Sequence, residues 1–242
     1  MIASERRLIL RFQELTSVPE WVWDRTDLEF LCVSDNRLTS ISEQIGRLSK
    51  LTALDIAHNQ LASIPDAIGD LPELSEYLYL ADNKLAEFPE TVCRLARLQY
   101  LGVTHNRIAE LPHSISGLAS LVELRAYDNE LKQLPGSIGS IASLRELHLS
   151  NNALTALPES IGQLGQLRIL DLRNNKIRAL PESLGQLVNL LYLDLRANAF
   201  ATLPDSLADL PRLQKLDLRW TDISGSASCI ARLEQRGCVV LR

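Results

Sequence analysis

The sequence predicts an α/β solenoid, a horseshoe of short repeats with a concave parallel β-sheet of about ten to eleven strands and a convex side of short helical turns. Three observations predict this class. Residues 144–166 and 167–189 carry the same 23-residue pattern, and most of the chain aligns with it. Leucines alternate with other residues early in each copy, which indicates a short strand. A proline then precedes apolar residues spaced three apart, which indicates a helical turn.

The repeated pattern is L-x-x-L-x-L-x-x-N-x-L, followed by L-P-x-x-I-G-x-L. The unit that opens at Leu144 shows this pattern in Leu147, Leu149, Asn152 and Pro158. The first part resembles the leucine-rich repeat. The ending resembles the 23-residue subclass found in bacterial repeat proteins and plant intracellular Ras-group-related repeat proteins. The resemblance covers nearly the whole chain and implies the horseshoe fold, whereas this scaffold binds many unrelated partners.

We expect one continuous domain, because each unit of a repeat array contacts only its neighbours. The first unit departs from the pattern: Gln13 replaces the asparagine, and Trp21 and Trp23 are expected to form a lid over the open end of the core. The predicted divisions of the domain 1–242 are an N-terminal capping repeat over 1–27, eight regular repeats over 28–212, and a C-terminal capping repeat with a closing strand over 213–242.

Two places break the regular spacing. Residues 75–77 stand where two residues are usual, which predicts a one-residue bulge where a strand begins. Near the C-terminus, Ile230 and Leu233 have helical spacing, and Val239 and Leu241 stand where an eleventh strand is expected to point its side chains inward. We expect a native closing strand here, although a chain cut from a longer protein is the alternative.

One asparagine in each unit is expected to be structural. After each strand the chain turns with buried backbone donors and acceptors, and an asparagine side chain can pair with both kinds across neighbouring units. The predicted ladder consists of Asn36, Asn59, Asn83, Asn106, Asn129, Asn152, Asn175 and Asn198.

The outward-facing strand positions predict a surface for a protein partner. Tyr77, Tyr79, Tyr100 and Tyr127 fall in neighbouring units together with Arg125, and tyrosine and arginine are residue types that anchor interfaces. The alternative is that large side chains merely cover a flat sheet. The predicted partner-binding residues are Tyr77, Tyr79, Tyr100, Arg125, Tyr127, His105, Asp128, His148, Asp171, Arg173, Tyr192, Asp194, Arg196, Asp217, Arg219 and Trp220.

An Asp-Leu-Arg triplet at 171–173 recurs at 194–196 and 217–219. Alternation places each aspartate and arginine on the same face, and stacking places like charges about 4.8 Å apart. Two interpretations stay open. The columns can neutralise each other as an ion-pair lattice, or they can present arginine donors to a carboxylate-bearing partner.

Composition narrows the function classes. The net charge of −5 and the pI near 5.5 argue against a nucleic-acid or anionic-membrane binder. The charged first residues lack the apolar core of a secretory signal, and no apolar run reaches the length of a membrane span. We therefore expect a cytoplasmic protein, although a translocated effector is compatible with the sequence. The four cysteines follow no metal-ligand spacing and are expected to be reduced, and the capped ends of the array predict a monomer.

We expect no enzyme activity, cofactor or metal site. His58, His105 and His148 lie in different units, too far apart to share a metal ion directly. None of G-x-S-x-G, a phosphate loop, H-E-x-x-H or C-x-x-C occurs. The sequence therefore predicts a protein-interaction module that binds its partner on the concave face. The alternative is the substrate- or GTPase-recognition part of a larger signalling or effector enzyme whose catalytic domain lies outside this chain.

Overall fold

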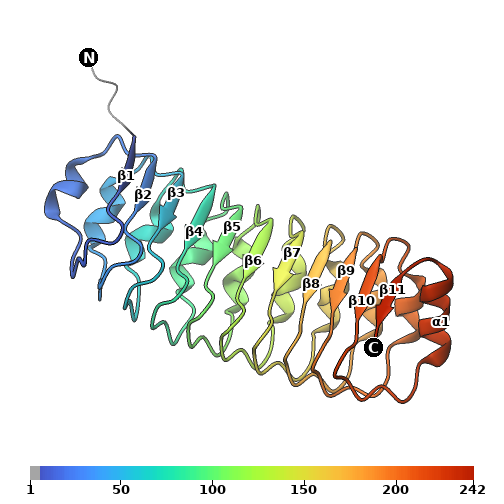
Figure 1. The fold of residues 1–242 in the computed structure, drawn as a ribbon. Coiled ribbons are helices and arrows are strands. Elements are labelled where there is room, and N and C mark those ends of the chain that lie inside the picture. The colour runs from blue at the N-terminus through green and yellow to red at the C-terminus, as the bar shows by residue number, and fades with distance from the viewer. Residues whose placement is uncertain (1–5) are drawn as a thin grey trace.

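The computed structural model describes residues 6–242, in which eleven short strands form one parallel sheet in chain order (Figure 1). The central residue of each strand points into the core, as Leu124 and Leu147 do, and its two neighbours point outward. The predicted fold class is confirmed. The strands are β1 Arg7–Ile9, β2 Phe30–Cys32, β3 Ala53–Asp55, β4 Tyr77–Tyr79, β5 Tyr100–Gly102, β6 Glu123–Arg125, β7 Glu146–His148, β8 Ile169–Asp171, β9 Tyr192–Asp194, β10 Lys215–Asp217 and β11 Val239–Leu241.

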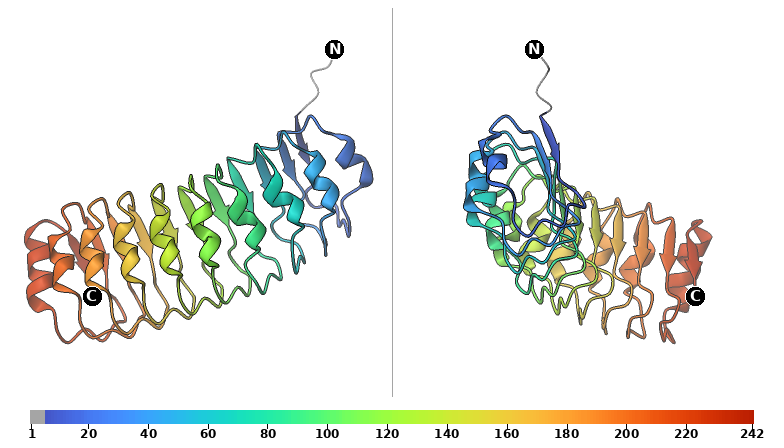
Figure 2. Two further views of the ribbon diagram at one scale, coloured as in Figure 1. Left: turned by 180° about the vertical axis from the view of Figure 1, so that it is seen from behind. Right: turned by 60° about the vertical axis from the view of Figure 1, so that its left-hand side comes forward.

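The opposite side of the solenoid carries short 3-10 helices and, at the C-terminal end, one α-helix (Figure 2). Successive helices pack against one another in the same order as the strands. They are η1 Glu20–Asp24, η2 Glu43–Arg47, η3 Asp66–Asp70, η4 Glu90–Arg94, η5 His113–Gly117, η6 Gly136–Ser140, η7 Glu159–Gln163, η8 Glu182–Gln186, η9 Asp205–Asp209 and α1 Ala227–Gln235.

In the described 3-10 helices other than η2, the repeated proline is the N-cap, the residue just before the first helical residue. Pro158 is the N-cap of η7 with extended backbone angles, and its carbonyl accepts a hydrogen bond from the Ile161 N–H at 3.0 Å. The proline thus lies one residue before the helix. In η2, Ser42 replaces the proline, and its Oγ accepts a hydrogen bond from the Gln44 N–H at 3.2 Å. Both residues thus set the start of a helix, by different means.

The glycine of the I-G-x-L ending lets the convex helices of neighbouring units touch. A Cβ on Gly139 would lie 2.2 Å from the Ser160 carbonyl oxygen, and one on Gly162 would lie 2.4 Å from that of Ser183. Neither distance is sterically possible. Glycine is therefore required here by the close approach of two backbones.

The ends of the array differ from the regular units. Near the start, Trp23 is buried whereas Trp21 is half exposed, so only one of the two tryptophans covers the core. Residues 1–5 of the predicted N-terminal cap lie outside the described residues. The predicted bulge lies just before β4. There the carbonyls of Ser75 and Glu76 each accept one hydrogen bond from the next unit, whereas in a regular unit one carbonyl accepts both.

The C-terminal helix α1 buries Cys229, Ile230 and Leu233 against the preceding unit. Gly237, at φ +88°, then turns the chain into β11. The expected eleventh strand exists, but its predicted register is wrong. Val240 pairs with Leu216 and packs against the core, so Val239 and Leu241 point outward. The turn at Gly237 places Cys238 in the core and shifts the inward positions by one residue.

The asparagine side chains link neighbouring units. Asn106 accepts a hydrogen bond from the Leu85 N–H at 3.0 Å, and its Nδ2 lies 3.0–3.1 Å from the carbonyl oxygens of Leu80, Val103 and Thr104. Asn59, two units earlier, makes the same set of bonds with Leu38, Val33, Ile56 and Ala57. These bonds pair backbone groups that would otherwise be buried without partners.

Candidate functional site: the concave sheet face

The outward side chains of the strands and of the following loops form columns along the sheet. The residue before each ladder asparagine has a left-handed backbone, with φ between +50° and +54° from Asp35 to Ala197, and Trp220 has φ +59° at the equivalent position before Thr221. Aspartate, asparagine and histidine adopt this conformation more readily than most residues. The backbone geometry therefore accounts for His58, His105 and Asp128 at these positions, independently of any partner.

Aromatic side chains gather on the face of β2 to β6, and we name Tyr77, Tyr79, Tyr100, His105 and Tyr127 the aromatic patch. The rings of Tyr77 and Tyr79 stack with centroids 4.5 Å apart. His105 meets Tyr127 edge-on at 5.5 Å. Tyr79 and Tyr100 are each 38% exposed, whereas Tyr77 is partly buried. Tyr79 and Tyr100 are therefore the rings of β4 and β5 that a partner can reach most directly.

Two neighbours hold the patch in place. A Cβ on Gly102 would lie 3.2 Å from Cδ1 of the Tyr79 ring, so this glycine leaves the room in which the ring lies. Tyr77 packs against Phe30, Cys32 and Ala53, a small apolar cluster outside the main core. Gly102 was not predicted for the site, although it is the only glycine among the outward positions of the described strands.

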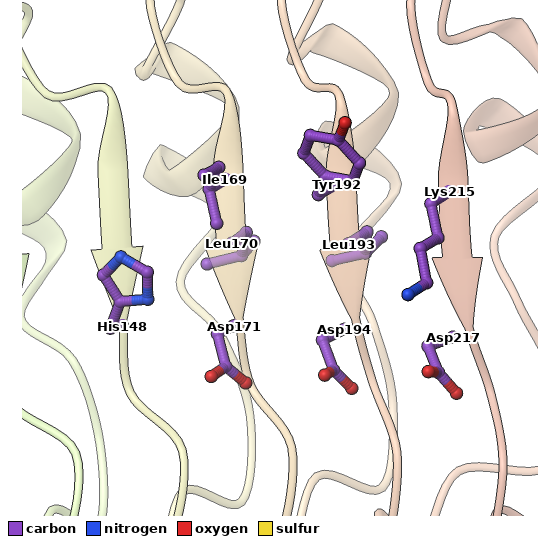
Figure 3. Close-up of a pocket in the computed structure, with 9 residues that line it drawn as sticks. All are labelled: His148, Ile169, Leu170, Asp171, Tyr192, Leu193, Asp194, Lys215 and Asp217. Atoms are coloured by element: carbon purple, nitrogen blue, oxygen red, sulfur yellow. The ribbon is translucent and has the colours of Figure 1, made fainter.

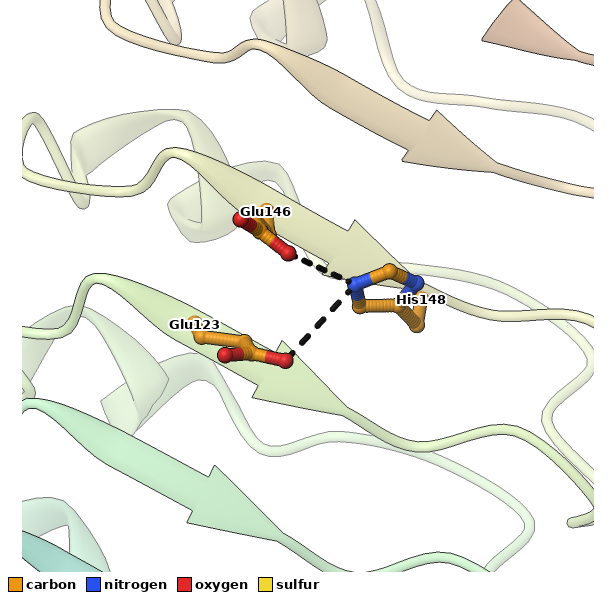
Figure 4. Close-up of side chains that lie close together, drawn as sticks. All are labelled: Glu123, Glu146 and His148. Atoms are coloured by element: carbon orange, nitrogen blue, oxygen red, sulfur yellow. Dashed lines mark hydrogen bonds and ion pairs between the residues drawn. The ribbon is translucent and has the colours of Figure 1, made fainter. Parts of the chain in front are cut away.

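A second group of side chains, the Glu–His cluster, lies on β6 and β7 and comprises Glu123, Glu146 and His148 (Figure 4). His148 Nε2 lies 3.2 Å from Glu146 Oε2 and 3.7 Å from Glu123 Oε1. Glu123 is only 12% exposed and also accepts a hydrogen bond from Arg125. Of these residues only His148 and Arg125 were predicted for the site.

The Asp-Leu-Arg triplets form paired columns on β8 to β10, which we name the Asp–Arg lattice. Arg196 makes a bidentate pair with Asp194, with Nη2 2.6 Å from Oδ2. Arg219 Nη2 lies 2.7 Å from Asp217 Oδ2, and Arg196 Nε reaches the same oxygen at 3.4 Å. The pairing is thus mainly within units, with one bridge between units. Asp171 and Arg173 form the loosest pair, with 3.6 Å between Nε and Oδ2.

A shallow pocket of about 190 Å³ lies beside the lattice (Figure 3). Its lining includes the carboxylates of Asp171, Asp194 and Asp217 on one side and Tyr192 and Lys215 on the other. Tyr192 is therefore part of this pocket and stands apart from the aromatic patch. At the end of the face, Trp220 is 75% exposed beside Arg219, whose Cζ lies 5.5 Å from the ring centroid.

Asp217 is buried, although it belongs to an outward-facing column of the sheet. Burial tends to raise the pKa of this carboxyl group, but hydrogen bonds from Arg219 and the charge of Arg196 hold its pKa below the usual value. A lowered pKa in the folded state stabilises the fold above the unfolded-state pKa of about 3.9. That contribution disappears as the pH falls through the folded-state pKa.

We expect Asp217→Asn to lower the free energy of unfolding at pH 7 by about 2 kcal/mol, because two arginines lose a buried charged partner. The difference from the unsubstituted protein should shrink as the pH approaches about 3. Urea unfolding at both pH values measures this. The exposed Asp222→Asn is the control and should change little at either pH. A difference that grows on acidification would contradict the role assigned to Asp217.

The cysteines lack the properties of nucleophiles. Cys32, Cys93, Cys229 and Cys238 are all buried free thiols, and burial raises the pKa of each. A catalytic cysteine needs the opposite, a lowered pKa and access to substrate.

In the described part of the chain, no helix has the length and hydropathy that crossing a membrane requires.

Similar solved structures share this architecture. The leucine-rich repeat ectodomain of the Arabidopsis thaliana receptor kinase GASSHO1/SCHENGEN3, in complex with CASPARIAN STRIP INTEGRITY FACTOR 2, is 33% identical with a TM-score of 0.79. The match covers 90% of this chain and 27% of that one. The plant peptide hormone receptor RGFR1 in complex with RGF2 is 28% identical with a TM-score of 0.80, over 98% of this chain and 43% of that one.

A bacterial structure, a leucine-rich repeat protein of Leptospira interrogans, has a TM-score of 0.55 at 22% identity, and the match covers 97% of this chain and 95% of that one. No curated protein sequence matches the chain significantly. Family sequence patterns do match it. The leucine-rich repeat region matches residues 74–153 and 135–235, which together are more than half of the chain, and a second leucine-rich repeat pattern matches residues 26–85. The chain therefore belongs to the leucine-rich repeat family.

Proposed function

We propose that this protein is an interaction module that binds a protein or peptide partner on its concave face, with the aromatic patch and Arg125 at the centre. The supporting observation is that Tyr79 and Tyr100 both lie partly exposed on the neighbouring, hydrogen-bonded strands β4 and β5. Such rings offer a large contact area and lose little conformational entropy on binding. The plant receptors named above were solved in complex with ligands, which supports an interaction role for this related chain.

The Asp–Arg lattice and the pocket beside it form the second part of the proposed surface. Because Arg173 pairs least closely with its aspartate, its guanidinium is the most available donor for a carboxylate on the partner. Arg196 and Arg219 already bond their own aspartates, so we propose that they mainly hold the lattice together.

A second candidate is the recognition part of a larger signalling or effector enzyme. It is favoured by the short span of this chain against the two plant structures, 27% and 43% of their lengths. For the chain itself we propose a non-catalytic, monomeric module of the 23-residue subclass. The four free thiols of the described residues favour a reducing compartment such as the cytoplasm.

Affinity capture with the full chain should identify a partner, and calorimetry should then measure its Kd. We expect Tyr79→Ala and Tyr100→Ala each to weaken binding by about 2 kcal/mol or more, which is about 30-fold in Kd. Trp21→Ala, which removes a half-exposed ring on the convex helix η1, is the matched control and should leave Kd unchanged. Unchanged affinity in both tyrosine variants, with thermal unfolding intact, would reject the aromatic patch as the site.

A further inference from the structure

The Glu–His cluster has the composition and geometry of a metal site. We propose that Glu123, Glu146 and His148 bind a divalent transition-metal ion of the zinc type. This proposal does not depend on the proposed function, because the three side chains can bind the ion without a protein partner. Figure 4 shows both glutamates directed toward the same nitrogen, Nε2 of His148, from β6 and β7.

The distances between the ligand atoms fit tetrahedral coordination. Zinc binds carboxylate oxygen and imidazole nitrogen at about 2.0–2.2 Å, so two ligand atoms of a tetrahedral site lie about 3.3–3.6 Å apart. The two measured distances from His148 Nε2 are 3.2 Å and 3.7 Å. All three ligand atoms lie within 4.8 Å of one another. Glu146 is the most exposed of the three, so its side chain can make the remaining adjustment.

The charges also favour a bound cation. Glu123 and Glu146 pair in register on neighbouring strands, where like charges repel each other. Among the described strands they are the only acidic residues at the outward position that opens a strand, since the others open with arginine, phenylalanine, alanine, tyrosine, isoleucine, lysine or valine. One imidazole with two carboxylates suits zinc, whereas magnesium and calcium prefer oxygen ligands alone.

Arg125 competes with the ion for Glu123. Its Nε donates a hydrogen bond to Glu123 Oε1, the oxygen that faces His148. The Arg125 side chain is half exposed and can swing away from this oxygen into solvent. Removing the Arg125 charge should therefore strengthen metal binding. This sign distinguishes a metal site from a cluster that serves only as an ion-pair network.

Three protein ligands leave a fourth position of the ion open. The cluster lies on β6 and β7, next to the Asp–Arg lattice that begins on β8, so a fourth ligand would approach it from the concave side. A histidine, cysteine or carboxylate of a bound protein has the chemistry to fill it. The ion would then bridge the two proteins. Binding of the ion by this chain does not require the partner.

Isothermal titration of the full chain with ZnCl2, in a chelator-free buffer, tests the proposal. We expect one ion per chain with a micromolar Kd, and no comparable binding of MgCl2. His148→Gln and Glu146→Gln should each weaken zinc binding at least about tenfold, and Arg125→Gln should strengthen it. His105→Gln is the matched control, because His105 also lies on this face beside a single carboxylate, Asp128, and should change nothing.

Cobalt(II) provides a second readout, since four-coordinate Co2+ absorbs visible light far more strongly than six-coordinate Co2+. The full chain should develop this absorption, and His148→Gln should abolish it. Circular dichroism checks that each variant is folded. If His148→Gln unfolds, the more exposed Glu146→Gln carries the same test. Absence of saturable zinc binding, or unchanged binding in a folded His148 or Glu146 variant, would overturn the proposal.

Discussion

Replacing Asn106 by alanine is expected to lower the free energy of unfolding by about 3 kcal/mol. The Asn106 amide accepts from the Leu85 N–H and donates to carbonyls of two neighbouring units. Alanine removes all of these bonds. A buried N–H and several carbonyl groups then lose their partner, at about 1–3 kcal/mol for each group left unpaired. Water that enters the space recovers part of this loss, which is why the expected effect is smaller than the sum.

Urea unfolding followed by circular dichroism measures this change. Asn189→Ala is the matched control, because the Asn189 side chain also donates to a backbone carbonyl, that of Gly165, but lies outside the ladder and makes only one such bond. It should cost less than about 1 kcal/mol. Equal effects of the two substitutions would show that the ladder asparagines have no special role.

Deleting residues 226–242 is expected to destabilise the C-terminal units by about 5 kcal/mol and to cause association of the shortened protein. The deletion removes α1 and β11, including the buried side chains of Ile230 and Leu233, which contribute about 1.5–3 kcal/mol each. It also leaves β10 as an unpaired edge strand, to which another chain can add. Light scattering and thermal unfolding measure both effects.

Point substitutions separate capping from general damage. Leu233→Ala should destabilise the protein by about 2–4 kcal/mol, whereas Glu234→Ala, exposed on the same helix, should change little. A shortened protein that stays monomeric and unfolds at the original temperature would contradict the proposed C-terminal cap.

The leucine periodicity predicted the sheet and the convex helices because it encodes burial directly. Every regular unit repeats the same inward positions, so a wrong assignment of inward residues in one unit can be recognised by comparison with the next. This redundancy fails at Val239 and Leu241, which follow α1, the single α-helix among residues 6–242. The turn at Gly237 determines which of these residues point inward. The regular units do not contain this turn, so their pattern could not predict the register.

The sequence predicted which side chains of the candidate site share a face of the sheet, but it did not predict which of them contact one another. The sequence placed Tyr79, Tyr100 and Arg125 on one face, where the structure has them. Convergence of Glu123 and Glu146 on His148 depends on side-chain conformation, which periodicity does not encode. The left-handed backbone before each ladder asparagine was also missed, because it follows from the turn geometry rather than from apolar spacing.

Hydroxyl-radical footprinting of the protein, with and without its captured partner, tests the concave-face proposal most directly. The method reports the solvent access of individual side chains, and tyrosine and tryptophan react readily. Tyr79 and Tyr100 should become protected in the complex, while Trp21 on the convex side should react as before. Protection of Trp21 with unchanged reactivity of both tyrosines would place the partner on the other side of the solenoid and contradict the proposal.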